Sequence, residues 1–276
     1  MKNNDRKIKV AAAQIYINSN IQQNTVRIIQ AIDIAANKGA DAIVFPECAI
    51  TGYPPCEKKH PSTMDKKEIA EALKNICNKA KANRINVIVG SIRFVNANTR
   101  NSAYAINSKG EIISVYDKIQ LVRGDNGDEP YFKAGNKLSI FKLNGIKCSM
   151  LICLDARYPE LYRCLARKGV KIIFQLFYGS GNNCSWKIPV IEGTLRCRAA
   201  ENGIFIVAAN VSRTPQMVVS RICDPNGISL ANAQYGKNEI VFADLDLKIE
   251  GGRFLETQRI DLIKTTPVSR TLFKTK

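Results

Sequence analysis

Three apolar segments of the sequence each lead into a residue that can do acid–base or covalent chemistry. The run AIVFPE ends at Glu47, IISVYDK ends at Lys118 and CSMLIC ends at Cys153. Such runs predict buried strands, and the ligands of α/β proteins collect at the carboxyl ends of strands. A carboxylate, an ammonium and a thiol brought together there would form a centre for nucleophilic catalysis.

Each of these residues also has a purely structural interpretation. A cysteine after a buried strand usually belongs to the core, and a glutamate or lysine after a strand is usually a solvated loop residue. The joint occurrence of all three in the same context favours Cys153 as a nucleophile. The only histidine, His60, lies in the polar loop PCEKKHPSTM, so Glu47 is the better candidate for a general base.

The expected surroundings of Cys153 bear on its reactivity, because the thiolate is the nucleophilic form of a cysteine. A helical pattern, ELYRCLARKG, follows this residue closely. The unpaired N–H groups at a helix start favour negative charge, and Lys118 would add a cation. We therefore expect the pKa of the Cys153 thiol to lie below its ordinary value of about 8.5.

The elements that must position these residues alternate at first and then form hairpins. A β-α-β-α-β series implies parallel strands with crossover helices and is predicted over residues 8–15, 20–39, 40–47, 66–84 and 85–92. Hairpins follow around the turns SKG, NG and DPNG, and further strands are predicted at VKIIFQLF, GIFIVAAN and EIVFADLDL. Apolar strands such as AIVF need cover on both faces. The sequence therefore predicts one α/β domain over residues 1–276, with two mixed sheets packed together and helices outside.

The charge of the chain is a second constraint on its function. The formal net charge is +17, from 41 basic and 24 acidic residues, but the cations are dispersed in segments such as DRKIK, DKKE and LARKGVK. That pattern is typical of a solvated surface, whereas nucleic-acid sites cluster their cations. No apolar run approaches about 20 residues, and the N-terminal run is too short for a signal peptide. We expect no nucleic-acid partner, no membrane contact and a cytoplasmic location.

The nine cysteines are scattered along the chain without a C-x-x-C pair. We expect reduced thiols, and five of them in apolar or helical surroundings are predicted to be buried: Cys48, Cys77, Cys148, Cys164 and Cys197. With one histidine and no paired ligand spacing, we expect no metal site, and the chemistry suggested by the three strand ends needs no cofactor.

Three motifs, in this order and at these intervals, resemble the Glu–Lys–Cys signatures of the nitrilase or carbon–nitrogen hydrolase superfamily: FPECAITGY, YDKIQL and ICLDARYPE. The segments GDEPYFKAG, RCRAAENGIFIVAAN and SRICDPNG match further parts of the family pattern. The resemblance implies a four-layer α-β-β-α sandwich and a homodimer or larger homo-oligomer. It also implies hydrolysis of a non-peptide C–N bond through a thioester, without metal or cofactor.

The resemblance implies roles for individual residues. Glu47 would take the thiol proton, Cys153 would attack the carbonyl carbon, and Lys118 with the Leu154 N–H would hold the oxyanion. Glu129, in GDEPYFKAG, is expected to orient Lys118 or the substrate nitrogen. Residues beside these are predicted to shape the substrate pocket: Tyr53, Arg157, Phe177, Tyr178, Trp186 and Asn210. Arg157 has two interpretations, binding of a substrate carboxylate or structural pairing with Glu160 or Asp155.

The substrate implied is a small amide or N-carbamoyl compound. The sequence LDARYPE after the cysteine resembles amidase-like and carbamoylase-like branches, and the Trp-Glu-Asn of true nitrilases is absent. Nitrilase activity is nevertheless an alternative. The segment FPECAITGYPP also resembles the glutaminase domains of NAD synthetases, so a glutaminase-type partner subunit of an amidotransferase is another. The non-enzyme alternatives are a pseudoenzyme scaffold and, on bulk charge alone, a nucleic-acid binder.

Overall fold

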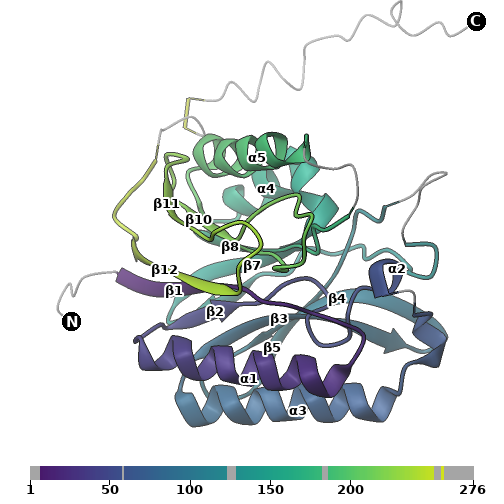
Figure 1. The fold of residues 1–276 in the computed structure, drawn as a ribbon. Coiled ribbons are helices and arrows are strands. Elements are labelled where there is room, and N and C mark those ends of the chain that lie inside the picture. The colour runs from purple at the N-terminus through teal and green to yellow at the C-terminus, as the bar shows by residue number, and fades with distance from the viewer. Residues whose placement is uncertain (1–6, 58, 123–128, 182–185, 252–255, 258–276) are drawn as a thin grey trace, which may run out of the picture.

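The computed structural model describes residues 7–57, 59–122, 129–181, 186–251 and 256–257. Its first half alternates as the sequence predicts (Figure 1), with β1 Lys7–Gln14, α1 Ile21–Asn37, β2 Ala42–Val44, α2 Pro54–Glu57, the 3-10 helix η1 Pro61–Thr63, α3 Lys66–Asn83 and β3 Asn86–Val95. β2 pairs in parallel with both β1 and β3. It is shorter than the predicted segment 40–47, and the chain turns after it at Cys48, which has a φ of 50°.

The remaining elements are mostly hairpins and one further crossover series. They are β4 Asn98–Ile106, β5 Ile112–Asp117, β6 Phe141–Leu143, β7 Ile146–Ile152, the 3-10 helix η2 Cys153–Arg157, α4 Pro159–Arg167, β8 Ile172–Leu176, α5 Lys187–Asn202, β9 Phe205–Ala209, β10 Arg221–Cys223, β11 Ser229–Asn232 and β12 Glu239–Asp246. The three predicted hairpins are β4–β5, β6–β7 and β10–β11. The helix predicted directly after Cys153 is preceded by η2.

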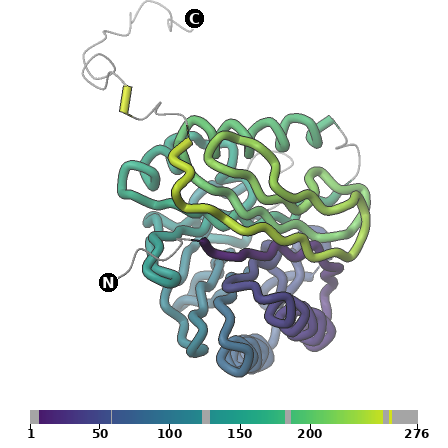
Figure 2. The backbone as a smooth tube through the Cα atoms, turned by 90° about the vertical axis from the view of Figure 1, so that its left-hand side faces the viewer, coloured from purple at the N-terminus to yellow at the C-terminus, as the bar shows by residue number. Residues whose placement is uncertain are grey.

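Two six-stranded sheets of mixed direction form the centre of the molecule. Their strand orders are β12-β1-β2-β3-β4-β5 and β11-β10-β9-β8-β7-β6. Helices α1 and α3 cover the first sheet and α4 and α5 cover the second, so the layers run α-β-β-α (Figure 1). Figure 2 shows the late strand β12 lying beside the first strand, with which it pairs antiparallel. The predicted four-layer sandwich with two mixed sheets is confirmed.

Side-chain alternation along the strands separates the apolar interior into two layers. In β2, Ile43 packs into the cluster beneath α1 and α3, while Val44 packs into the cluster between the sheets. In β3, Val87 and Ile88 divide in the same way. Both faces of the first sheet are therefore covered, which is why its central strands consist of continuous apolar runs.

Local signals in the sequence set the ends of the elements. Asn20 caps α1 by accepting a 2.9 Å hydrogen bond from the Gln23 N–H, and Asp65 caps α3 through the Lys67 N–H. Gly39, with a φ of 73°, follows the end of α1 in the left-handed conformation that glycine favours. In the described part of the chain, no helix is both long enough and apolar enough to cross a membrane.

The predicted burial of five cysteines is correct only in part. Cys48 and Cys148 are buried and Cys77 is half-buried, but Cys164 and Cys197 are exposed. The last two lie on α4 and α5, whose inward faces are formed by other residues, such as Leu165 and Leu195. A helix in an outer layer has one face toward solvent. Cys164 and Cys197 lie on that face, whereas the sequence pattern predicted them on the buried face.

The turn that carries Glu47 lies directly over β3, and Gly90 is the point of contact. A Cβ atom at Gly90 would lie 2.6 Å from the Cys48 nitrogen and 2.6 Å from the Pro46 oxygen. We expect Gly90→Ala to displace this turn, to lower the free energy of unfolding by about 1–3 kcal/mol and to reduce activity. Gly193→Ala, in α5, is the control, because a Cβ atom at Gly193 would have no neighbour within 4 Å. Equal urea midpoints for the two variants would contradict the close contact.

Candidate active site

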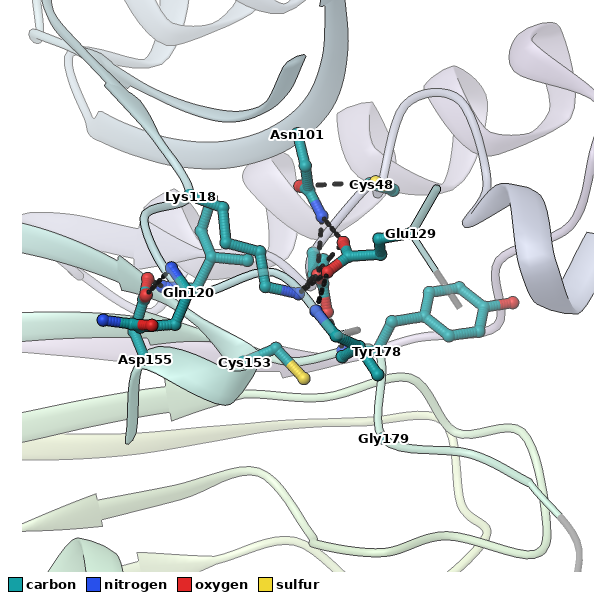
Figure 3. A network of polar contacts seen from close by, with 12 residues as sticks. Cys48, Asn101, Lys118, Gln120, Glu129, Cys153, Asp155, Tyr178 and Gly179 are labelled. Atoms are coloured by element: carbon teal, nitrogen blue, oxygen red, sulfur yellow. Dashed lines mark hydrogen bonds and ion pairs between the residues drawn. The ribbon is translucent and has the colours of Figure 1, made fainter. Parts of the chain in front are cut away.

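The three strand-end residues converge, together with Glu129, at one edge of the sheets. The Lys118 Nζ lies 2.8 Å from Glu47 Oε1 and 2.9 Å from Glu129 Oε2 (Figure 3). All three of these side chains are buried, and Figure 3 shows the thiol of Cys153 on the side of the Lys118 ammonium. Glu47 comes from the loop after β2, Lys118 from the end of β5 and Cys153 from the end of β7. The structure thus brings the four predicted catalytic residues together.

Asn101 joins these residues and was missed by the sequence analysis. Its Nδ2 donates to Glu47 Oε1 at 2.7 Å and to Glu129 Oε1 at 2.8 Å. Its backbone oxygen accepts from the Lys118 N–H at 2.8 Å. The sequence signal for it was an asparagine at the start of the hairpin segment NSAYAI, because a polar side chain on a buried strand needs partners there. Asn101 therefore holds the two carboxylates at a fixed separation.

The loop after β8 fixes the second oxygen of Glu47. The Tyr178 N–H donates to Glu47 Oε2 at 2.9 Å, and the Glu47 N–H donates to the Phe177 oxygen at 3.1 Å. This loop is fixed in turn by Asn210, whose Oδ1 accepts from the Gly179 N–H at 2.7 Å. Asn210 is fully buried and is not among the described residues that line the cavity, so the structure does not bring it to the predicted substrate pocket. Both ends of its amide are occupied by backbone groups, which leaves none for a ligand.

A cavity of about 190 Å³ opens beside the thiol and contains most of the predicted pocket residues. Its lining includes Tyr53, Cys153, Leu154, Arg157, Phe177 and Tyr178, and adds residues that the sequence did not indicate, namely Cys56, Lys187, Ile191, Thr194 and Met217. Trp186 is 60% exposed and is not part of the lining. A larger groove of about 540 Å³ lies between α1 and β12, but none of the predicted site residues lines it.

Among the described residues that line the cavity, two are cations and none has an acidic side chain. They are Arg157 in η2 and Lys187 at the start of α5. Within the described residues, neither forms an ion pair. The predicted alternative, in which Arg157 pairs with Glu160 or Asp155, is not what the structure shows. The carboxylate of Asp155 is instead occupied by Tyr116 and by backbone N–H groups.

The backbone at Cys153 holds its side chain at the edge of the cavity. Its φ is 47°, in the left-handed region that non-glycine residues avoid, at a cost of about 1–3 kcal/mol. The strand thus turns sharply at the nucleophile candidate, and the residue stays partly exposed although its neighbour Ile152 is fully buried. Strained backbone of this kind is often found at functional sites.

The electrostatics of the thiol correct a prediction from the sequence. Burial raises the pKa of Cys153 well above its ordinary value, and the negative charge and hydrogen bond of Glu47 raise it further. Lys118 lowers this pKa, as expected, but by less than burial and Glu47 raise it. Burial also opposes the charge of Lys118, yet Glu47 and Glu129 raise the ammonium pKa above its ordinary value. The resting site therefore combines a neutral thiol with a charged lysine.

Nothing in the described part of the chain groups three His, Cys, Asp or Glu side chains in a way that could hold a metal ion. The polar groups of the site are instead satisfied by one another. Glu129, for example, accepts from Lys118 and from the Val122 N–H, which lies 2.9 Å from its Oε2. Burial is nevertheless the largest influence on Glu129 and raises the pKa of its carboxyl.

The chain and its fold are similar to known amidases. The chain is 31% identical over 221 residues to the 2-oxoglutaramate amidase of Bacillus subtilis, covering 77% of this chain and 80% of that protein. It is 27% identical over 268 residues to an omega-amidase of Saccharomyces cerevisiae, covering 88% and 89%. Its fold is similar to the crystal structure of an amidase from Nesterenkonia, with a TM-score of 0.80 and 22% identity over 94% of this chain and 96% of the other.

The family match extends over both sheets and all the residues of the site. The family model described as carbon–nitrogen hydrolase matches residues 9–250, from β1 to beyond β12. This range includes the loops that carry Glu47, Lys118 and Cys153. The chain therefore belongs to the carbon–nitrogen hydrolase family and is an enzyme of that class.

Proposed function

We propose that the protein hydrolyses the C–N bond of a small amide through a thioester on Cys153. The observation that carries the proposal is the position of the thiol, at the edge of a cavity and beside the Lys118–Glu47 pair. A nucleophile at the edge of a cavity, with a base and a fixed cation beside it, provides the groups that acyl transfer requires.

The reaction begins with proton transfer from the thiol. Because the pKa of Cys153 is raised, the sulfur is protonated at neutral pH and needs a base as it attacks. Glu47 is that base, since its carboxylate faces the thiol and its own orientation is held by Asn101 and the Tyr178 N–H. Sulfur then bonds to the amide carbonyl carbon, and the carbonyl π electrons move to its oxygen.

The oxyanion is stabilised by the Lys118 ammonium and by the backbone N–H of Leu154. Preorganised donors of this kind contribute roughly a hundredfold to a thousandfold each to the rate. Glu47 returns the proton to the nitrogen, ammonia or an amine departs, and the thioester forms. A water that gives its proton to Glu47 then attacks the thioester carbon, and the acid is released with the thiol restored. Glu129 is a positioning residue that holds Lys118 in place.

The wall of the cavity suggests the class of amide. Arg157 and Lys187 provide two cations, and the described part of the lining contains no acidic side chain, so a carboxylate on the substrate would be attracted there. Two relatives support this choice by name, as a 2-oxoglutaramate amidase and an omega-amidase. 2-Oxoglutaramate carries a carboxylate at the end opposite its amide. We infer a substrate with a primary amide at one end and a carboxylate at the other. Homo-oligomeric assembly and a cytoplasmic location stay predictions.

The first test is ammonia release from a panel of small amides and their matched nitriles. We expect the best amide to exceed its nitrile by at least about tenfold in kcat/KM, because a nitrile adduct develops charge on a nitrogen that needs a proton and makes no oxyanion. Cys153→Ala should lose at least about a thousandfold. A nitrile hydrolysed faster than its own amide would place the protein with nitrilases, and an active Cys153→Ala variant would overturn the mechanism.

The second test follows alkylation of Cys153 by iodoacetamide with pH, using peptide mapping to separate this site from the exposed Cys164 and Cys197. Below the pKa of a thiol the thiolate fraction rises with pH, so the rate should increase about tenfold per pH unit from pH 7 to 9 without a plateau. Glu47→Gln removes a charge that raises this pKa, so alkylation at pH 7 should become faster while turnover is lost. A plateau in the wild type below pH 8 would contradict a raised pKa.

The third test compares succinamate with succinamide, which replaces the carboxylate by a second amide of the same size. We expect kcat/KM to favour succinamate by at least about tenfold, or about 1.4 kcal/mol. Lys187→Met should remove most of this preference, mainly through a higher KM for succinamate. Lys171→Met, an exposed lysine outside the cavity, is the matched control. Equal rates for the two substrates in the wild type would rule out the carboxylate and leave amide hydrolysis intact.

A further inference from the structure

The carboxylate of Asp155 lies buried between the two sheets, two residues after the nucleophile candidate. It is 0% exposed and accepts three hydrogen bonds. Its Oδ2 accepts from the Ile152 N–H at 2.9 Å and from the Tyr116 hydroxyl at 2.8 Å, and its Oδ1 accepts from the Gln120 N–H at 2.9 Å. Neither oxygen is left unpaired, and neither lines the cavity.

The three donors come from the two segments that deliver the reactive groups. Ile152 is the last residue of β7 and directly precedes Cys153, in the second sheet. Tyr116 and Gln120 flank Lys118 on both sides, at the end of β5 in the first sheet. One carboxylate therefore joins the turn of the thiol to the turn of the ammonium, as Figure 3 shows for its contact with Gln120.

The turn at Cys153 needs such support, because its left-handed backbone is unfavourable for a residue with a side chain. Asp155 secures the residue before the cysteine. A second buried group secures the cysteine carbonyl, since Gln175 Nε2 donates to it at 3.4 Å and the Tyr162 hydroxyl donates to Gln175 Oε1 at 2.5 Å. The hydrogen bond from the Ile152 N–H to Asp155 is shorter than the one from Gln175 to the Cys153 carbonyl. Asp155 alone of these two groups also binds the residues on either side of Lys118.

We propose that Asp155 is a positioning residue that sets the placement of the Cys153 thiol relative to the Lys118 ammonium, and that only its ionised carboxylate does so. The inference rests on the proposed roles of Cys153 and Lys118. Asp155 touches neither the cavity nor a reacting atom. A protonated carboxyl would present an O–H to one of three donors and break that hydrogen bond. The connection between the turn at Cys153 and the turn at Lys118 would then be weaker.

The charge state of Asp155 gives the proposal a distinct readout. Burial raises its pKa from the ordinary value to about 6, against the hydrogen bonds from Ile152, Gln120 and Tyr116 and the charge of Lys118, which lower it; Tyr162 is the other titratable group beside it. As pH falls through 6 the carboxylate is lost, so kcat should fall on the acid side with a step near that pH. Tyr116→Phe removes one of the influences that lower the pKa and should move this step to higher pH.

The experiment measures kcat, KM and their pH profiles for Asp155→Asn, with the concentration of folded sites taken from Cys153 alkylation. We expect kcat per site to fall by at least about tenfold, KM to change by less than about threefold, and the step near pH 6 to disappear. Asp224→Asn is the matched control, because Asp224 is also a buried carboxylate that accepts from two backbone N–H groups, Asn226 and Ile228, but lies in the β10–β11 turn. It should lower the melting temperature and leave kcat per site unchanged.

A value of kcat per site in Asp155→Asn equal to wild type would overturn the proposal and show that Asp155 serves folding alone. If Asp155→Asn does not fold, Tyr116→Phe decides, and an acid step unmoved by that variant counts against Asp155. Failure of the mechanism itself would look different. In that case Cys153→Ala would retain amide hydrolysis, whatever the behaviour of the Asp155 variants.

Discussion

The burial of one lysine ammonium between two carboxylates is the interaction on which this site depends. Moving such charges out of water costs several kcal/mol per ion, and their attraction compensates only when the geometry is fixed and the remaining polar atoms are bonded. Here Lys118 has Glu47 and Glu129 within 2.9 Å, and Asn101 bridges the two carboxylates. Each ion is therefore held by groups from several strands and loops, and no single element could supply them.

That requirement explains why the fold places the site between two sheets. Glu47 and Lys118 come from the first sheet, whereas Cys153 and the Tyr178 N–H come from the second. A two-layer interior provides enough depth to exclude water from the ions and still opens a cavity at its edge. The resting state that results has a neutral thiol beside a charged lysine. In the proposed reaction negative charge develops on the substrate oxygen, where Lys118 can stabilise it without moving.

The sequence could predict the layers and the principal residues because both follow from short patterns. Apolar runs ending at Glu47, Lys118 and Cys153 predict buried strands with reactive ends, and the Asn-Gly turn at Asn144 predicts a hairpin. The family resemblance added Glu129 and the order of the layers. Patterns along one strand do not reveal what lies across from it. Asn101 and Lys187 were therefore missed, since their importance arises only when separate elements meet.

Two differences between the sequence predictions and the structure have the same origin, because the sequence does not give the distances between side chains. Asn210 follows a buried strand, as the predicted catalytic residues do. Its amide, however, forms hydrogen bonds with the backbone N–H and oxygen of Gly179. The thiol pKa was expected to be lowered because the sequence shows a following helix and a lysine. The sequence does not show that burial and Glu47 together raise the pKa of this thiol by more than Lys118 lowers it. Whether a pKa rises or falls depends on competing influences whose sizes are set by packing.

Under the proposed function, the distribution of charge around the cavity would determine how a substrate binds. Arg157 and Lys187 line the wall with positive charge, whereas the thiol of Cys153 lies beside Lys118, Glu47 and Glu129, which are buried behind the lining. A molecule with an amide at one end and a carboxylate at the other would be repelled in one orientation and attracted in the other. Its carboxylate belongs with the cations and its neutral amide with the thiol. Under the proposed function, substrate orientation would therefore follow from the position of these two cations relative to the thiol in a cavity of about 190 Å³.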